Sequence, residues 1–178
     1  MDSDLKALFG SWEQALGTLL SAISSTPSLN INETMQTNLS LLGNVMQATG
    51  NALIADSEKE VTLGKFGNQI QAIGNSTSIA GLLLPYNENT KSELNIKGNL
   101  LQALGSAVSL PDLLNANKIS FNELLNIYAS LLQMIGNSLQ AIAGNIEQRG
   151  ENGQKINFVG SWLQTIGAFI HALVQSKN

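Results

Sequence analysis

Few side chains in this sequence could act as acids, bases or metal ligands, and their spacing does not bring them together. His171 is the single histidine, and its helical neighbours four residues away are Gly167 and Gln175. A histidine base needs a nucleophile and an orienting partner, and a metal needs several ligands at defined spacing. The chain has no cysteine and no His-x-x-x-His or Glu-x-x-His pattern. We therefore interpret His171 as a surface residue near a helix C-terminus, where the helix dipole favours a cation.

The carboxylates do not form a catalytic pair in the sequence either. Glu58 and Glu60 are two residues apart, so on a helix they point to different faces and are typical of solvated helix ends. No GxxxxGK[ST] loop and no strand-linked GxGxxG motif is present to hold a phosphate. The sequence predicts no catalytic residue, no cofactor and no metal site, and hence a protein that is not an enzyme.

Charge and composition narrow the kind of partner and compartment. The net charge is −4 and the basic residues are scattered, which argues against nucleic acid because no stripe of Lys and Arg exists to neutralise phosphates. The N-terminus lacks the basic start and apolar run of a signal peptide. Four uncharged stretches have the length of a bilayer span, but each holds several amide or hydroxyl side chains, which are costly in lipid. We expect a soluble, cytoplasmic protein with one domain, residues 1–178.

The strongest signal is an internal repeat of about 31 residues. Its six copies are GSWEQALGT from Gly10, GNVMQATGN from Gly43, GNQIQAIGN from Gly67, GNLLQALGS from Gly98, ASLLQMIGN from Ala129 and GSWLQTIGA from Gly160. Glutamine holds the fifth position of every copy: Gln14, Gln47, Gln71, Gln102, Gln133 and Gln164. Glycine recurs at the first and eighth positions: Gly10, Gly17, Gly43, Gly50, Gly67, Gly74, Gly98, Gly105, Gly136, Gly160 and Gly167.

Each copy lies in the middle of an amphipathic helical pattern. In the fourth copy, the apolar arc that we expect to face the core consists of Leu100, Leu101, Leu104, Ala107 and Val108. The two glycine positions share one flank of this arc, and the recurring alanine lies on the other flank. Glutamine and asparagine fall next to the glycines, and we place them on the outer face.

Helix boundaries follow from prolines and capping patterns. Pro27, Pro85 and Pro111 fall between the copies, where helices tend to stop. Capping-box spacing occurs at Ser57/Glu60, Thr90/Glu93 and Ser120/Glu123. These signals predict helices near residues 4–24, 32–55, 58–82, 91–109, 121–147 and 153–175. Because short links force neighbouring helices to run antiparallel, the predicted fold is all-α, an up-and-down antiparallel bundle of six helices built from six one-helix repeats.

The glycine pairs predict close contact between helices. Each glycine costs roughly 0.5–1 kcal/mol of helix propensity relative to alanine, and close packing at the low end of the usual interaxial range of about 8–10 Å would compensate. The motif glutamine that lies beside each glycine pair would form a hydrogen bond to the next helix or face water. Alternatively, the glycine and glutamine strip marks a surface for a partner or for self-association.

Two further features allow a structural and a functional interpretation. Trp12 and Trp162 share the third motif position in the first and last copies. They anchor the core where the ends of the array meet, or they touch a membrane or partner.

The charged residues gather near helix ends, leaving helix middles almost uncharged. This is typical of exposed, capped ends, and alternatively indicates a middle zone that meets a membrane or another copy of the protein.

The repeat also resembles a known group of proteins. The motif around Gly67–Asn75, Gly98–Ser106, Gln133–Asn137 and Gly160–Gly167 is similar to that of small, uncharacterised repetitive helical proteins of Bacillus-type endospore-forming bacteria. Ala129 in place of the first glycine and Thr49 in place of the apolar residue depart from the pattern. The resemblance implies a family of unknown function and transfers no catalytic residue.

The sequence therefore supports three functional hypotheses. The first is a non-enzymatic scaffold or interaction module that binds an unidentified protein or another copy of itself. The second is a membrane-active protein that associates with lipid. The third is a small-ligand binder with a pocket inside the bundle, as helical bundles can host.

Overall fold

The protein is all-α, as its repeat predicts. The computed structural model describes residues 2–114 and 120–177, and within these ranges it contains helices and turns but no strand. The six helices are α1 (Ser3–Ser24), α2 (Glu33–Ser57), α3 (Leu63–Leu83), α4 (Glu88–Leu114), α5 (Phe121–Gln148) and α6 (Gln154–Gln175), with a short 3₁₀ turn at Pro27–Leu29. Each α-helix carries one copy of the motif near its middle, which confirms the prediction of six one-helix repeats.

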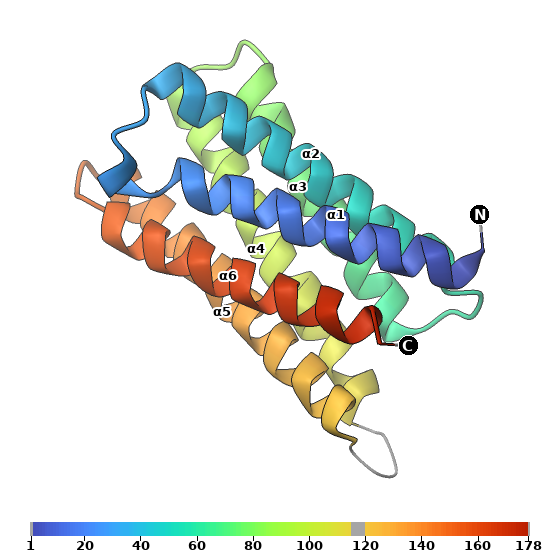
Figure 1. Ribbon diagram of the computed structural model, residues 1–178. Coiled ribbons are helices and arrows are strands. Elements are labelled where there is room, and N and C mark those ends of the chain that lie inside the picture. The colour runs from blue at the N-terminus through green and yellow to red at the C-terminus, as the bar shows by residue number, and fades with distance from the viewer. Residues whose placement is uncertain (1, 115–119, 178) are drawn as a thin grey trace.

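The helices close into a ring. Each one packs mainly on its two neighbours in the chain, and α1 also packs on α6, so that the first and last helices meet. Figure 1 shows α1 between α2 and α6 on the near side, with α3 and α4 behind them. Three helical hairpins, α1–α2, α3–α4 and α5–α6, have the most extensive contacts. The fold is therefore a barrel of three hairpins.

Several helix ends differ from the predicted ones. α3 begins at Leu63 instead of residue 58, because the Thr62 side chain accepts a hydrogen bond from the Lys65 backbone N–H and caps the helix there. Pro111 lies inside α4 and not between helices. It falls in the last turn, where a missing N–H removes only one of the final hydrogen bonds.

Of the three predicted capping boxes, Ser120 and Glu123 form one at the start of α5. The other two do not mark helix starts: Ser57 is the last residue of α2, and Thr90 lies within the first turn of α4. The start of α4 is instead capped by Asn87, whose side chain accepts from the Thr90 backbone N–H at 2.9 Å.

The motif glycines hold each hairpin together through backbone contact. A methyl group added at Gly10 would lie 2.7 Å from the carbonyl oxygen of Gly50, and one added at Gly17 would lie 2.6 Å from that of Gly43. The same reciprocal contacts join Gly67 to Gly105 and Gly74 to Gly98 in α3–α4, and Gly136 to Gly160 and Gly167 to Ala129 in α5–α6. These distances leave no room for a side chain, so the predicted close approach is present within all three hairpins.

Replacing a seam glycine should destabilise the barrel. In Gly74→Ala the new methyl group would lie 2.7 Å from the carbonyl oxygen of Gly98 and 3.0 Å from the backbone nitrogen of Gln102. Separating two backbones is costly, and we expect a loss of about 1–3 kcal/mol in the free energy of unfolding, measured by urea denaturation.

Gly64→Ala in the same helix is the matched control. The nearest atom to its added methyl group is 3.5 Å away, on the Glu58 side chain, and the helix propensity gained is about 0.5–1 kcal/mol. We expect this variant to be neutral or slightly stabilised. Equal effects of the two substitutions would contradict the account of the seam.

Candidate functional site

The interior of the barrel is polar. The buried apolar residues of the described chain are nine alanines with Ile127 and Val174, whereas the buried polar ones include all six motif glutamines. The largest fully buried side chain is that of Gln133, which is 2% exposed. The helices therefore turn their amide and hydroxyl groups inward.

The glutamines of the odd-numbered helices form one layer across the barrel. The Nε2 amide of Gln14 in α1 lies 3.3 Å from Oε1 of Gln71 in α3 and 3.2 Å from Oε1 of Gln133 in α5. It also lies 2.9 Å from Oδ1 of Asn51 in α2. Two amide hydrogens are thus shared among three acceptors, and a single side chain joins three hairpins.

The glutamines of the even-numbered helices form a second layer. Nε2 of Gln164 in α6 donates to Oε1 of Gln47 in α2 at 2.9 Å and to Oε1 of Gln102 in α4 at 3.0 Å. Oε1 of Gln164 in turn accepts from Nε2 of Gln140 at 2.9 Å. The motif repeat therefore produces two hydrogen-bonded layers. One comes from the odd-numbered helices and the other from the even-numbered helices, which run in the opposite direction.

Each layer depends on the glycine seams. Gly50 faces Gln14 and Gly17 faces Gln47, and a methyl group at Gly17 would lie 2.9 Å from Cγ of Gln47. The eighth-position glycine faces the motif glutamine of the paired helix in the other hairpins as well, at Gly74/Gln102, Gly105/Gln71, Gly136/Gln164 and Gly167/Gln133. Close approach of the helices and inward placement of the glutamines are thus two results of one contact.

The predicted orientation of the helices is therefore wrong. In α4, Leu100 is 53% exposed and Leu104 is 51% exposed, while Leu101, Ala107 and Val108 are only partly buried. Gln102 and Asn99, which we placed outside, are buried. The reason is steric: a helix that presents its glycine flank to a neighbour carries the adjacent glutamine inward and turns its apolar arc away.

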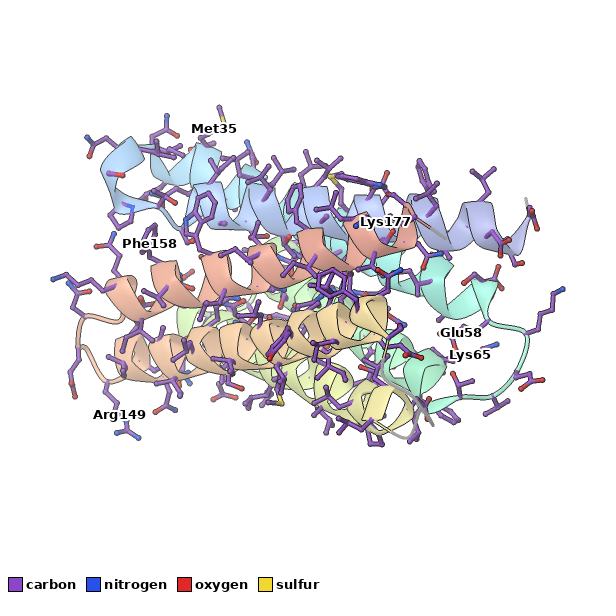
Figure 2. The ribbon with its side chains drawn as sticks, turned by 60° about the horizontal axis from the view of Figure 1, so that its bottom comes forward. Met35, Glu58, Lys65, Arg149, Phe158 and Lys177 are labelled. Carbon is purple, nitrogen blue, oxygen red and sulfur yellow. The ribbon has the colours of Figure 1, made fainter. Side chains whose placement is uncertain are left out.

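The apolar arcs form a belt around the outside of the barrel. We define the apolar belt by one exposed apolar residue near the middle of each helix: Leu16, Val45, Ile73, Leu104, Ile135 and Ile166. Five of these residues occupy the seventh motif position. In α2 that position is Thr49, so the belt residue of this helix is Val45, at the third motif position. Figure 2 shows Glu58 and Lys65 at one end of the bundle and Arg149 at the other.

The glutamine layers separate two cavities. The first, which we name the serine cavity, has a volume of about 410 Å³ and is bounded by Gln47, Gln102 and Gln164. The second, which we name the histidine cavity, has a volume of about 360 Å³ and is bounded by Gln14, Gln71 and Gln133. Each cavity thus ends on one glutamine layer, and the two face opposite ends of the barrel.

His171 is not the surface residue that the sequence suggested. It lines the histidine cavity, with Nδ1 3.0 Å from Oδ1 of Asn126 and Nε2 3.2 Å from Oγ of Ser130. This arrangement suits a neutral ring with its proton on Nδ1. Burial penalises the charged ring and lowers the pKa of His171 to about 4. Its role in the described structure is a hydrogen-bonded link between α5 and α6.

The two tryptophans lie at the seam between α1 and α6. Trp12 donates from Nε1 to Oγ of Ser176 at 3.0 Å and packs edge-on against Phe169. Trp162 donates from Nε1 to Oγ1 of Thr26 at 3.1 Å. Their equivalent motif positions therefore become reciprocal contacts that join the first helix to the last.

Of the two carboxylates that the sequence analysis considered, Glu58 lines the histidine cavity and Glu60 does not. The Glu58 backbone carbonyl accepts from Nζ of Lys65 at 2.7 Å, and its side chain accepts from the Thr62 hydroxyl. Glu60 is exposed in the α2–α3 link. Within residues 2–114 and 120–177, no three histidine, aspartate or glutamate side chains gather where they could hold a metal ion.

Hydropathy provides a separate finding about the helices. Across the described residues, none of the six combines the length and the apolar character that crossing a membrane requires.

The fold and interior define a closed six-helix repeat barrel with amide layers across its axis. The chain belongs to a family of unknown function (DUF6944), whose model matches residues 5–172. No curated protein and no solved structure matches the chain. The match agrees with the resemblance to a family of unknown function, while the bacterial group that the resemblance named stays a prediction.

Breaking the second glutamine layer should lower stability. Gln164→Met keeps a similar volume, but it leaves Oε1 of Gln47 and Gln102 without their donor and Nε2 of Gln140 without its acceptor. Each unpaired buried group costs about 1–3 kcal/mol, so we expect a loss of at least about 2 kcal/mol in urea unfolding. Gln69→Met, at an exposed site in α3, is the control and should be neutral. An unchanged midpoint in Gln164→Met would show that the layer does not stabilise the barrel.

The stability of the protein should fall below neutral pH because of His171. Its pKa is about 4 in the folded protein and about 6.5 when unfolded, so the unfolded chain takes up the proton first as the pH falls. Stability should decrease from about pH 6.5 to about pH 4, by up to roughly 3 kcal/mol at 1.36 kcal/mol per pKa unit. His171→Gln should flatten this part of the profile in chemical denaturation. Identical pH profiles of the wild type and His171→Gln would refute a partly buried His171 that stays neutral in the folded protein.

Proposed function

We propose that the protein is a non-enzymatic interaction module that binds through its apolar belt, and that lipid is the partner. The observation that carries this is the belt itself, which places a large apolar side chain on the outside of every helix. Large exposed apolar patches are typical of protein or membrane interaction sites. The hydrogen-bonded interior supports the non-enzymatic part, because its glutamines are engaged with one another.

The distribution of the belt favours lipid over a single folded partner. The six belt residues come from six helices that close into a ring, so a globular protein docked on one side would leave most of them in water. Lipid chains can cover a curved apolar surface from all sides. The proposal concerns the outside of the assembled barrel, whose helices keep their polar sides on the lumen.

Charge placement also fits this proposal. Two of the three ion pairs of the described residues, Lys6–Asp56 and Glu88–Lys91, lie near helix ends, and the third, Glu93–Lys97, reaches the residue before the α4 motif. The middle of the barrel is therefore apolar and carries few charges, with Glu13 inside the α1 motif as an exception, and such a zone between two charged ends suits contact with hydrocarbon and polar headgroups.

Flotation with liposomes tests the proposal. The purified protein is mixed with neutral or anionic phospholipid vesicles and centrifuged on a density gradient. We expect it to float with the vesicles. The double variant Ile73→Ser/Leu104→Ser should bind about tenfold more weakly, because the exposed half of each apolar side chain contributes about 1 kcal/mol when it enters lipid.

Val61→Ser is the control for this experiment. Val61 is exposed in the α2–α3 link, outside the belt, so its replacement should leave flotation unchanged. Wild-type protein that stays at the bottom of the gradient would refute lipid binding. If light scattering then shows a concentration-dependent oligomer that the double variant lacks, the belt serves self-association instead.

A further inference from the structure

The serine cavity contains polar groups without partners, and they gather on the α3–α4 hairpin. Oγ of Ser78 is 1% exposed and has no hydrogen-bond partner. Ser78 lies against Gly98, where a methyl group would come within 2.2 Å of Oγ. Asn99, the next residue of α4, is 7% exposed, and its side chain makes no hydrogen bond with the described residues. Both residues line the cavity.

Comparison of the repeats shows that this hairpin is the unusual one. Ser21 in α1 occupies the position equivalent to Ser78, and its Oγ accepts from Nε2 of Gln47 at 3.1 Å and donates to the Gly17 carbonyl at 3.2 Å. In α5 the equivalent residue, Gln140, bonds to Gln164.

The corresponding pair in the α3–α4 hairpin, Ser78 and Gln102, is not bonded. Oε1 of Gln102 accepts from Gln164, while its Nε2 makes no hydrogen bond with the described residues. The hydrogen bond at this position is thus present in the α1–α2 and α5–α6 hairpins. It is missing in α3–α4, where Ser78 and Gln102 both line the serine cavity.

The open groups define the chemistry of a ligand. Ser78 offers a hydroxyl that donates and accepts, Asn99 offers an amide with both functions, and Gln102 offers an N–H donor. Asn44 adds the acceptor Oδ1 and one further hydrogen of its Nδ2, whose other hydrogen is donated to the Ser40 carbonyl at 2.8 Å. A solute that matches them must carry several donors and several acceptors on one small skeleton.

The lining also argues for a neutral solute. Hydroxyl and amide side chains dominate the wall, and of its charged residues Glu88 and Lys91 are paired with each other at 2.8 Å, leaving Glu147. No aromatic side chain lines the cavity among the described residues, so a flat ring gains no stacking face. The volume of about 410 Å³ lies in the range of small-molecule sites.

We propose that the serine cavity is a binding site for a small, neutral polyol, held by Ser78, Asn99 and Gln102. Hydroxyl groups of the polyol complete the hydrogen bonds that the α3–α4 hairpin leaves open. The site is independent of what covers the apolar belt, because the cavity lies inside the ring, at one end.

Isothermal titration calorimetry with sorbitol tests this inference. We expect saturable binding of sorbitol to the wild type, and clearly weaker binding of gluconate, which is similar in size but charged, and of 1,6-hexanediol, which lacks most of the hydroxyls. The double variant Ser78→Ala/Asn99→Leu removes two bonding partners and should raise the Kd by about tenfold or more. Ser78→Ala alone removes one oxygen and should raise the Kd by a smaller factor. This single variant keeps the inference testable if the double variant does not fold.

Ser106→Ala is the matched control. Ser106 is buried in the same helix as Asn99 but lines the histidine cavity, so sorbitol binding should be unchanged. The inference is overturned if sorbitol does not bind saturably to the wild type, which would mean that water alone fills the cavity. It is also overturned if gluconate or hexanediol binds as well as sorbitol, or if both Ser78 variants keep the wild-type affinity.

Discussion

The contact between a glycine of one helix and the motif glutamine of its paired helix is the constraint on which the rest of the structure depends. At the α1–α2 seam, Gly50 admits the backbone of Gln14, and Gly17 admits Cγ of Gln47. Because the paired helices are antiparallel, the two glutamines of a hairpin lie about three residues, or roughly 4.5 Å, apart along the axis. Three such hairpins supply three glutamines to each of two layers.

This geometry accounts for both the polar interior and the apolar exterior. A side chain that bonds across the barrel, as Gln14 does to Gln71 and Gln133, must lie on the lumen side of its helix. The apolar arc of the same helix, with Leu16 at its centre, then has only the outside or the flanks to occupy. Buried amides add little net stability even when paired, and Asn137 has neither amide atom paired. What the layers supply is a fixed register for six helices whose interior is otherwise largely alanine, glycine and serine.

The sequence predicts the helices, their antiparallel order and the close seams, because each depends on local pattern or on glycine. It does not predict which side faces inward, because the amphipathic rule assumes that the wider apolar arc of a helix such as α4 is buried. One signal was present: Gln102 and its five equivalents recur without exception, whereas a glutamine facing water could be replaced by any polar residue. The cavities could not be predicted, since they arise from residues on all six helices. The partial burial of His171 likewise depends on Ser130 and Asn126 of a neighbouring helix.

The most direct test of the account is the reactivity of single cysteines introduced into this cysteine-free chain. Gln102→Cys and Leu104→Cys place a thiol at two positions of α4 that are 3% and 51% exposed. With a bulky, water-soluble maleimide in dilute, lipid-free solution, we predict rapid labelling of Leu104→Cys and slow labelling of Gln102→Cys. The opposite order, with the thiol at 104 protected and the thiol at 102 reactive, would show a conventional apolar core and contradict the polar-inside barrel.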